Sequence, residues 1–394
     1  MATSWAFEME SLILGWYILV ETQSVMLLAI FQSLQYTGTF LGPLFGVMGD
    51  RIGHRKMLCA MRAAYATLAT TLMVLTLTGI VSPVHVFIIA GLSGLVRPSD
   101  IGMRAAVVGD IMPTAQLMAA MGIQRTTQDS ARIAGALTGA GLVALMGMGA
   151  AYAVVATLYT TSFLLTWKAG GAHAAAAPAG PRKHERASPL RELKQGLVYV
   201  FNTPLLLAVM CLAFILNMTA FPLLNGLLPY VAKEIYLGNQ TVLGYMVAGA
   251  SFGALMGSLL VSRNGTALPA ARVVVVFSVM WYAMMFVFSR METPAAGIAA
   301  LMFAGFAQSF SQVPMAAILL RNTDADYRGR VMGIRMLMIN GNIPGLLISG
   351  PLIASYGYPV TAAIYCAIGI GFTLLIAAKW RAQLWRWDSP ANRH

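Results

Sequence analysis

The sequence predicts an all-α integral membrane protein with twelve transmembrane helices, and three observations support this. Residues of hydrophobic type make up 58% of the 394 residues, and only 10% are charged, against about 25% in a typical soluble domain. The mean hydropathy is +0.71. The apolar residues gather in runs close to the ~20 residues that a helix needs to cross a bilayer. This composition excludes a soluble enzyme, a disordered chain and a disulfide-rich secreted domain.

The expected spans are uniformly apolar rather than alternating, which indicates helices and not the strands of a membrane barrel. They cover residues 5–20, 25–46, 57–80, 84–106, 117–146, 150–167, 204–229, 241–261, 270–289, 294–318, 331–354 and 359–379. The first run, from Trp5 to Val20, is short and is interrupted by Glu8 and Glu10. We therefore expect helix 1 to be truncated at its N-terminal end.

The segment between the sixth and seventh runs is not membrane-like. It is rich in Ala, Gly, Pro and basic residues, and Ser188-Pro189 then provides a good start for a helix. Leu190, Leu193 and Leu197 recur at helical spacing among charged residues, which predicts an amphipathic helix at the inner membrane interface. The expected organisation is a six-helix bundle over 1–167, a cytoplasmic linker over 168–203, a second six-helix bundle over 204–380 and a cytoplasmic tail over 381–394.

The basic residues orient the chain. If both termini are cytoplasmic, most of the Lys and Arg residues lie in cytoplasmic segments, and the opposite side holds only Lys233 and Arg290. This asymmetry follows the positive-inside rule. It also accounts for the net charge of +12 without a nucleic-acid partner, because the charge lies in short loops rather than on one solvated face.

The two halves of the sequence repeat each other weakly. Ile133-Ala-Gly135-Ala-Leu137 is similar to Ile343-Pro-Gly345-Leu-Leu347, an offset of 210 residues, and Gly147 matches Gly357 at the same offset. Two further stretches match at nearly the same offset. A consistent offset predicts that each half is one copy of a six-helix unit, the plan of many secondary transporters.

The clearest local motif lies between the second and third runs and reads Gly46-Val-Met-Gly-Asp50-Arg51-Ile-Gly53-His54-Arg55-Lys56-Met-Leu58. Its glycines allow close helix approach, and Asp50 can accept hydrogen bonds from a neighbouring helix N-terminus. Such a cluster can hold one conformational state closed at the cytoplasmic side. The alternative is a basic loop that only fixes topology. The gating-loop candidates are Gly46, Asp50, Arg51, Gly53, His54, Arg55, Lys56 and Asp110.

This motif resembles the signature loop of the major facilitator superfamily, G-x-x-x-D-R-x-G-R/K-R/K-x-x-L, with His54 at a position that is usually basic. Residues 103–113, 131–135, 190–204 and 328–334 are similar to the branch of bacterial exporters that contains the enterobactin exporter and the transmembrane secretion effectors. The resemblance covers nearly the whole chain. It implies the two-bundle fold of that superfamily and the efflux of hydrophobic or chelating small molecules.

Charged residues within spans are functional candidates because they are costly in lipid unless they face a cavity or a partner. Arg97, Asp100 and Arg104 share one helix face, as do Arg125, Asp129 and Arg132. Internal charge pairing that packs the helices is the alternative reading of these two ladders. The proton-coupling candidates are Glu8, Glu10 and Asp129, with Glu8 first because Arg97 is expected to reach it. The substrate-cavity candidates are Gln32, Gln35, Arg97, Arg132, Asn217, Asn225, Gln308 and Gln312.

We therefore expect a secondary active transporter that exports a small hydrophobic, amphipathic or chelating molecule, of drug or siderophore type, by proton antiport with alternating access. It is expected to be a monomer in the bacterial cytoplasmic (inner) membrane, with substrate, protons and lipid as partners. The sequence has no CxxC, no metal-ligand spacing and no phosphate-binding motif, so we expect no enzyme activity, cofactor or metal. The alternatives are an importer or uniporter of the same fold, and a non-transporting membrane sensor or scaffold.

Overall fold

A computed structural model describes the chain except for residues 42–44, 46–47, 49–51, 112–113, 169–188, 265–268, 325–326 and 386–394. It also leaves undescribed the side chains of residues 101–102, 105–106, 108–111, 114–125, 189–190, 192, 264 and 328. The described residues form helices and their connections, and no β-strand occurs among them.

The first half contains α1 (Ala2–Thr22), α2 (Val25–Leu34), the 3₁₀ turn η1 (Thr37–Leu41), α4 (His54–Leu77), α5 (Pro83–Ile111) and α6 (Thr114–Lys168). The linker helix is α7 (Pro189–Asn202). The second half contains α8 (Pro204–Phe221), η2 (Pro222–Gly226), α9 (Leu228–Tyr230), η3 (Val231–Ile235), α10 (Gln240–Asn264), α11 (Ala270–Phe288), α12 (Pro294–Arg321), α13 (Arg328–Met338), η5 (Ile339–Gly341), α14 (Asn342–Tyr356), α15 (Tyr358–Lys379) and α16 (Arg381–Leu384).

Each apolar run in the sequence coincides with helical structure where its residues are described, which confirms the predicted all-α membrane fold. Eight helices in the described part of the chain are long and apolar enough to cross a membrane. The helices α1 and α5 are also long, but their glutamates, aspartate and arginines lower their hydropathy. The predicted span 331–354 is divided at the 3₁₀ turn η5, because Pro344 has no N–H to bond the carbonyl of Asn340.

Two glycines at the same position of the internal repeat have the same unusual backbone conformation. Gly147 has φ 80° and ψ 174°, and Gly357 has φ 77° and ψ 166°. Both values fall in a region that is essentially restricted to glycine. Gly147 forms a kink in α6 that divides the two predicted spans 117–146 and 150–167, just as Gly357 divides α14 from α15. The structure thus confirms the repeat at the point where each half makes its last turn.

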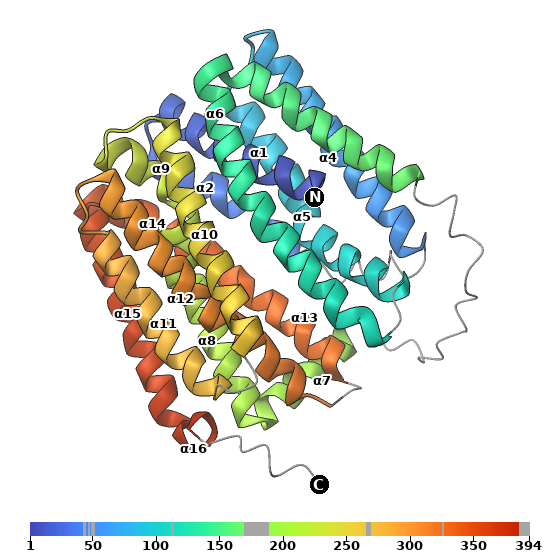
Figure 1. Cartoon of the computed structure of the whole chain (residues 1–394), viewed down its shortest axis with the longest axis vertical. Helices are drawn as coiled ribbons and strands as arrows, with labels where there is room; N and C mark the ends of the chain where they lie inside the picture. The colour runs from blue at the N-terminus through green and yellow to red at the C-terminus, as the bar shows by residue number, and fades with distance from the viewer. Residues whose placement is uncertain are drawn as a thin grey trace. The chain divides into compact units, whose positions relative to one another are not determined.

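The chain forms two compact units, Met1–Pro189 with Ala232–Ala248, and Leu190–Val231 with Gly249–His394, here called unit 1 and unit 2. In unit 1, α6 packs along both α1 and α4, and α4 also contacts α5 (Figure 1). In unit 2, α11 lies along α12, while α8 contacts α14 and α15 (Figure 1). The packing of unit 1 is therefore centred on α6, while α11 and α12 form the most extensive helix pair of unit 2.

Glycines allow the closest helix crossing in unit 2. Gly249, Gly253 and Gly257 recur every fourth residue on α10, and a Cβ on Gly253 would overlap the carbonyl of Met302 on α12. Ser309 Oγ of α12 donates a hydrogen bond to the carbonyl of Ala254 at 2.6 Å. Small residues at this spacing bring membrane helices into backbone contact, so α10 and α12 form a tight pair.

The helix α7 occupies the segment for which the sequence predicts an amphipathic helix. Its buried residues are Gly196 and Val200, whereas Arg191 and Lys194 are exposed together with the apolar side chains of Val198 and Phe201. An outward face that combines cations with large apolar side chains is typical of a helix at a membrane surface. The predicted position of α7 at the inner interface remains a prediction.

Candidate functional site

The first glutamate of α1 faces the first part of α6. Glu8 Oε2 lies 3.7 Å from Arg132 Nε, and both side chains are about a quarter exposed. Gly135, one turn after Arg132, permits this approach, because a Cβ there would lie 2.8 Å from Glu8 Cβ. A long, partly exposed ion pair between two membrane helices can open without unfolding either helix. Arg132, and not only the expected Arg97, is therefore available to Glu8.

The second glutamate of α1 contacts the second part of α6. Glu10 is 6% exposed, and its Oε2 accepts a hydrogen bond of 2.8 Å from the hydroxyl of Tyr159 in the second part of α6. The Tyr159 ring stacks on Tyr65 of α4, with ring centroids 5.4 Å apart. The two-residue spacing predicts that Glu8 and Glu10 point in different directions, and their separate partners confirm this.

The polar candidates of α2 and α5 gather around one glutamine. Arg97 of α5 donates a hydrogen bond to Gln35 Oε1, and its guanidinium lies over the ring of Phe7. Gln35 Nε2 in turn donates to Gln32 Oε1 at 3.0 Å. Ser11 Oγ of α1 also donates to Gln35 Oε1 at 3.3 Å. The sequence candidates Gln32, Gln35 and Arg97 therefore form one hydrogen-bonded group.

A small cavity of about 20 Å³ lies beside this group, between α1, α2 and α5. Its polar lining comes from Glu10, Ser11, Gln35, Ser93 and Arg97. The volume is that of about one water molecule. The cavity is too small for an organic substrate, but Glu10 and Arg97 both line it.

Two of the three charged residues on one face of α5 form an ion pair with each other. Arg104 is paired with Asp100, four residues earlier on the same helix, and also donates to Ser4 Oγ of α1 at 2.9 Å. Asp100 is only 2% exposed. For Asp100 and Arg104 the structure thus supports helix packing, the alternative reading of this ladder. On α6, Asp129 is buried, while the side chain of Arg125 lies outside the described residues.

The gating-loop candidates are only partly described. Gly46, Asp50 and Arg51 lie outside the described residues, and so does the side chain of Asp110. Gly53 precedes α4 with φ 97° and ψ 130°, a positive φ that favours glycine. His54 begins α4, Lys56 is exposed, and Arg55 Nη2 donates to the carbonyl of Trp167 at 2.9 Å. A cation at the C-terminal end of α6 stabilises the helix dipole.

The unit 2 candidates are neutral. Asn217 of α8 is buried, accepts a hydrogen bond of 2.9 Å from Asn342 Nδ2 of α14 and donates to the carbonyl of Ala213. Gln308 and Gln312 lie half-buried on α12, and Asn225 lies half-buried in η2. Among the residues whose side chains are described, the buried carboxylates Glu10, Asp100 and Asp129 all belong to unit 1. The two units therefore repeat in fold but not in chemistry.

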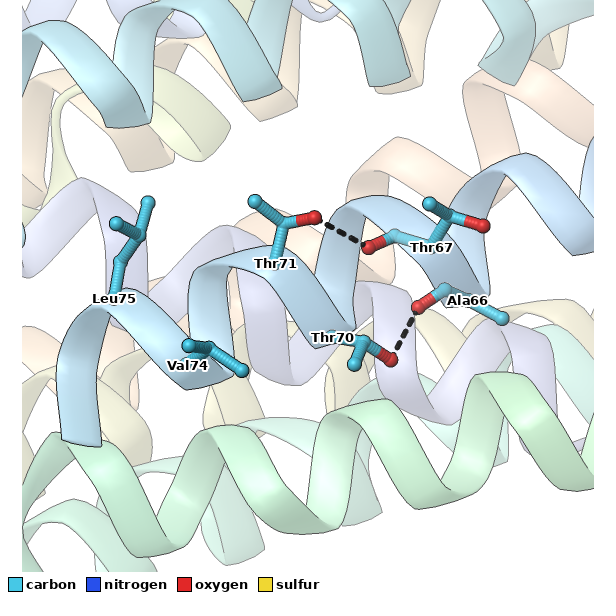
Figure 2. A pocket seen from close by; sticks show the side chains of 6 residues that line it. All are labelled: Ala66, Thr67, Thr70, Thr71, Val74 and Leu75. Atoms are coloured by element: carbon cyan, nitrogen blue, oxygen red, sulfur yellow. Dashed lines mark hydrogen bonds between the residues drawn. The ribbon is translucent and has the colours of Figure 1, made fainter. Parts of the chain in front are cut away.

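A shallow groove lies on α4, but it lacks the chemistry of a transport site. Its lining comes from Ala66, Thr67, Thr70, Thr71, Val74 and Leu75 of this one helix (Figure 2). Thr70 donates to the carbonyl of Ala66 at 2.7 Å, and Thr71 to that of Thr67 at 3.0 Å (Figure 2). These hydroxyls are satisfied by their own helix, which suits an apolar environment.

Tyr159 and Ser11 are site residues that sequence reasoning did not single out. A signal for Tyr159 was present, because Tyr152 and Tyr159 are seven residues apart and share one face of α6. Both are fully buried next to α1. No group of three or more His, Cys, Asp or Glu side chains that could hold a metal ion occurs in the described part of the chain.

Comparison with known proteins identifies the family of the chain. The family model of the Major Facilitator Superfamily matches residues 3–344 and 210–394. The chain belongs to this superfamily. This confirms the family that the loop at residues 46–58 indicates, and it makes the protein a multi-pass membrane transporter. None of the curated protein sequences matches the chain.

Solved structures share the fold of this superfamily member at low sequence identity. The nucleoside transporter NupG, as a point mutant, has a TM-score of 0.66 at 14% identity, covering 96% of this chain and 98% of that chain. A bacterial homolog of the human lysosomal transporter Spinster, inward-facing and unoccupied, has a TM-score of 0.71 at 12% identity, covering 99% and 98%. A D-xylose-proton symporter has a TM-score of 0.68 at 12% identity, covering 95% of each chain.

Proposed function

We propose that this transporter exports a small hydrophobic, amphipathic or chelating molecule by exchange against protons. It would lie in the bacterial inner membrane with both termini in the cytoplasm. The observation that carries the proposal is the Glu8–Arg132 pair of unit 1. A carboxylate on a spanning helix is costly unless it has a partner or a function, and here the pair is long and partly exposed.

The pair provides a simple means of coupling. In its ionised state, Glu8 can exchange Arg132 for a cationic or hydrogen-bond-donating group of the substrate. Protonation of Glu8 removes this acceptor and releases the group. Proton and substrate then compete for the Glu8 carboxylate, which is the requirement for antiport. A state-dependent contact of this kind shifts an equilibrium only by the difference in its strength between the two states.

The residue types of each unit, taken separately, support an amphipathic substrate. In unit 1, the aromatic rings of Phe7 and Phe31 lie beside the polar group of Gln35 and Arg97. In unit 2, the candidates Asn217, Asn225, Gln308 and Gln312 offer neutral hydrogen-bonding groups. A molecule with a large apolar part and few polar groups suits such residue types better than a highly hydroxylated one.

Proton-linked uptake of a polar solute is the second candidate. It is favoured by the fold shared with a D-xylose-proton symporter and a nucleoside transporter. In that case proton and solute would bind together, because protonation of Glu8 would weaken its hold on Arg132 and let the guanidinium contact the solute. The sign of the proton movement therefore separates the two candidates.

The test uses the purified chain in liposomes that contain the pH-sensitive dye pyranine and have no initial gradient. Ethidium, 2,3-dihydroxybenzoate, uridine and xylose are added outside in separate runs. Antiport predicts that entry of ethidium or 2,3-dihydroxybenzoate makes the interior alkaline, whichever way the protein is inserted. Acidification on adding uridine or xylose would establish symport instead, and no pH response to any probe would contradict proton coupling. Liposomes without protein serve as the control.

A further inference from the structure

The linker helix α7 is attached to unit 2 by close packing. A Cβ on Gly196 would lie 3.0 Å from Arg330 Cβ and 3.1 Å from Ile334 Cδ1, so α7 and α13 approach at the width of a glycine. Val200, one turn later, is 2% exposed. Residues 168–203 are predicted as one linker, but these contacts join its helical part to α13.

One side chain of α7 fixes the connection between α12 and α13. Tyr199 Oη donates a hydrogen bond of 3.1 Å to Asp324 Oδ2 and accepts one of 3.2 Å from the N–H of Asp324. The ring of Tyr199 stacks on that of Tyr327, with centroids 4.4 Å apart and an interplanar angle of 10°. Arg330 lies over the Tyr327 ring at 5.1 Å. A single tyrosine thus contacts the connection through both its hydroxyl and its ring.

The other end of α7 is joined to α8 with almost no intervening chain. Thr203 is the one residue between the two helices, and its N–H donates to the carbonyl of Val200 at 3.1 Å. Its hydroxyl donates to the carbonyl of Tyr199 at 2.9 Å. The N–H of Leu207 in α8 then donates to the Thr203 carbonyl at 3.0 Å. This continuous set of bonds allows little independent movement of α7 relative to α8.

We propose that Tyr199 is a latch that makes α7 a fixed part of unit 2, so that the body that moves as one begins at Leu190, in the first turn of α7, and not at Pro204. Any displacement transmitted along the segment that joins the two halves would then act on α8, α12 and α13 together. This inference goes beyond the proposed export function, because it does not depend on the substrate, the direction of transport or the coupling ion.

The stacked pair provides matched variants for the test. Tyr199→Phe and Tyr327→Phe both keep the two rings, but only Tyr199→Phe removes the hydroxyl that bonds Asp324. Hydrogen–deuterium exchange of the full chain in lipid nanodiscs is measured by mass spectrometry. In Tyr199→Phe, the peptide that contains the Asp324 amide is expected to exchange at least about tenfold faster, while Tyr327→Phe stays within about twofold of the parent. Exchange in peptides from α11 reports whether either variant loosens unit 2 as a whole. These peptides are expected to exchange at the rate of the parent chain.

Equal exchange in the two variants, or no acceleration in Tyr199→Phe, would overturn the latch. A distance measurement tests whether α7 moves with unit 2. Spin labels at the exposed positions Val198 of α7 and Phe372 of α15, in a chain with Cys59, Cys211 and Cys366 replaced, should give one narrow distance distribution. Tyr199→Phe should broaden it and Tyr327→Phe should not. A broad distribution in the parent chain would show that α7 is not part of the moving body.

Discussion

Replacement of Gly357 by alanine tests the backbone geometry that the two halves share. Gly357 has φ 77° and ψ 166°, where a residue with a Cβ is strained by about 1–3 kcal/mol. The nearest atom to an added Cβ is Pro359 Cδ at 3.9 Å, which is ordinary van der Waals contact. Gly357→Ala therefore introduces backbone strain without a clash. Alanine also restricts the unfolded chain, which stabilises by about 0.4–1 kcal/mol, so the expected net loss is about 1–2 kcal/mol.

The assay is a thermal melt in detergent, followed by the reaction of a fluorogenic maleimide with cysteines that unfolding exposes. Cys366 on α15 is buried and lies nine residues after the substitution, so it reports on the helix that the strain affects. A loss of about 1–2 kcal/mol should lower Tm by about 2–8 °C for a unit of this size. Gly147→Ala, at the equivalent position of the first half, should lower Tm similarly, since its added Cβ would meet nothing within 4 Å.

Two further variants isolate the cause. Gly371→Ala lies inside α15, and an added Cβ there would also meet nothing within 4 Å, so it should stabilise by up to about 1 kcal/mol through helix propensity. Gly357→Asn should not restore stability, because asparagine tolerates ψ near +45° at positive φ and not ψ near 166°. A Tm for Gly357→Ala at or above that of the parent chain would refute the reasoning, as would an equal loss in Gly371→Ala.

Three other predictions follow from the structure. Glu8→Gln should abolish pH-gradient-driven efflux from proteoliposomes but leave downhill exchange measurable. The control Glu21→Gln, at the exposed end of the same helix, should transport like the parent chain. Retained uphill efflux in Glu8→Gln would move the coupling role to Asp129. Tyr159→Phe should destabilise by about 1–3 kcal/mol, because it removes a hydroxyl that donates to the buried carboxyl group of Glu10. The exposed control Tyr245→Phe should change the free energy of unfolding by less than about 0.5 kcal/mol. For topology, an impermeant maleimide should label Val198→Cys only from the cytoplasmic side. The same reagent should label Leu237→Cys, in an 85%-exposed position, only from outside. The reverse pattern would invert the proposed orientation.

The sequence identifies the membrane class and the repeated halves because these depend on local properties. A bilayer requires that each spanning segment satisfy its own backbone hydrogen bonds, so apolar length alone locates α4, α11 and α15. Gly147 and Gly357 stand out for a related reason, since a turn with positive φ favours glycine wherever the chain places it. The loop at residues 46–58 indicates the superfamily, although Gly46, Asp50 and Arg51 lie outside the described residues.

The partners of individual polar side chains were decided only by the tertiary structure. The sequence puts Arg97 near Glu8 as a candidate, and the structure adds a hydrogen bond from Arg97 to Gln35 and places Arg132 beside Glu8. Tyr159 and Glu10 are 149 residues apart, and Tyr199 and Asp324 are 125 apart. Such pairs depend on how each helix is rotated about its axis and how closely its small residues let a neighbour approach. Hydropathy contains neither quantity, because many rotations bury the same apolar residues, and only the packed helices select one of them.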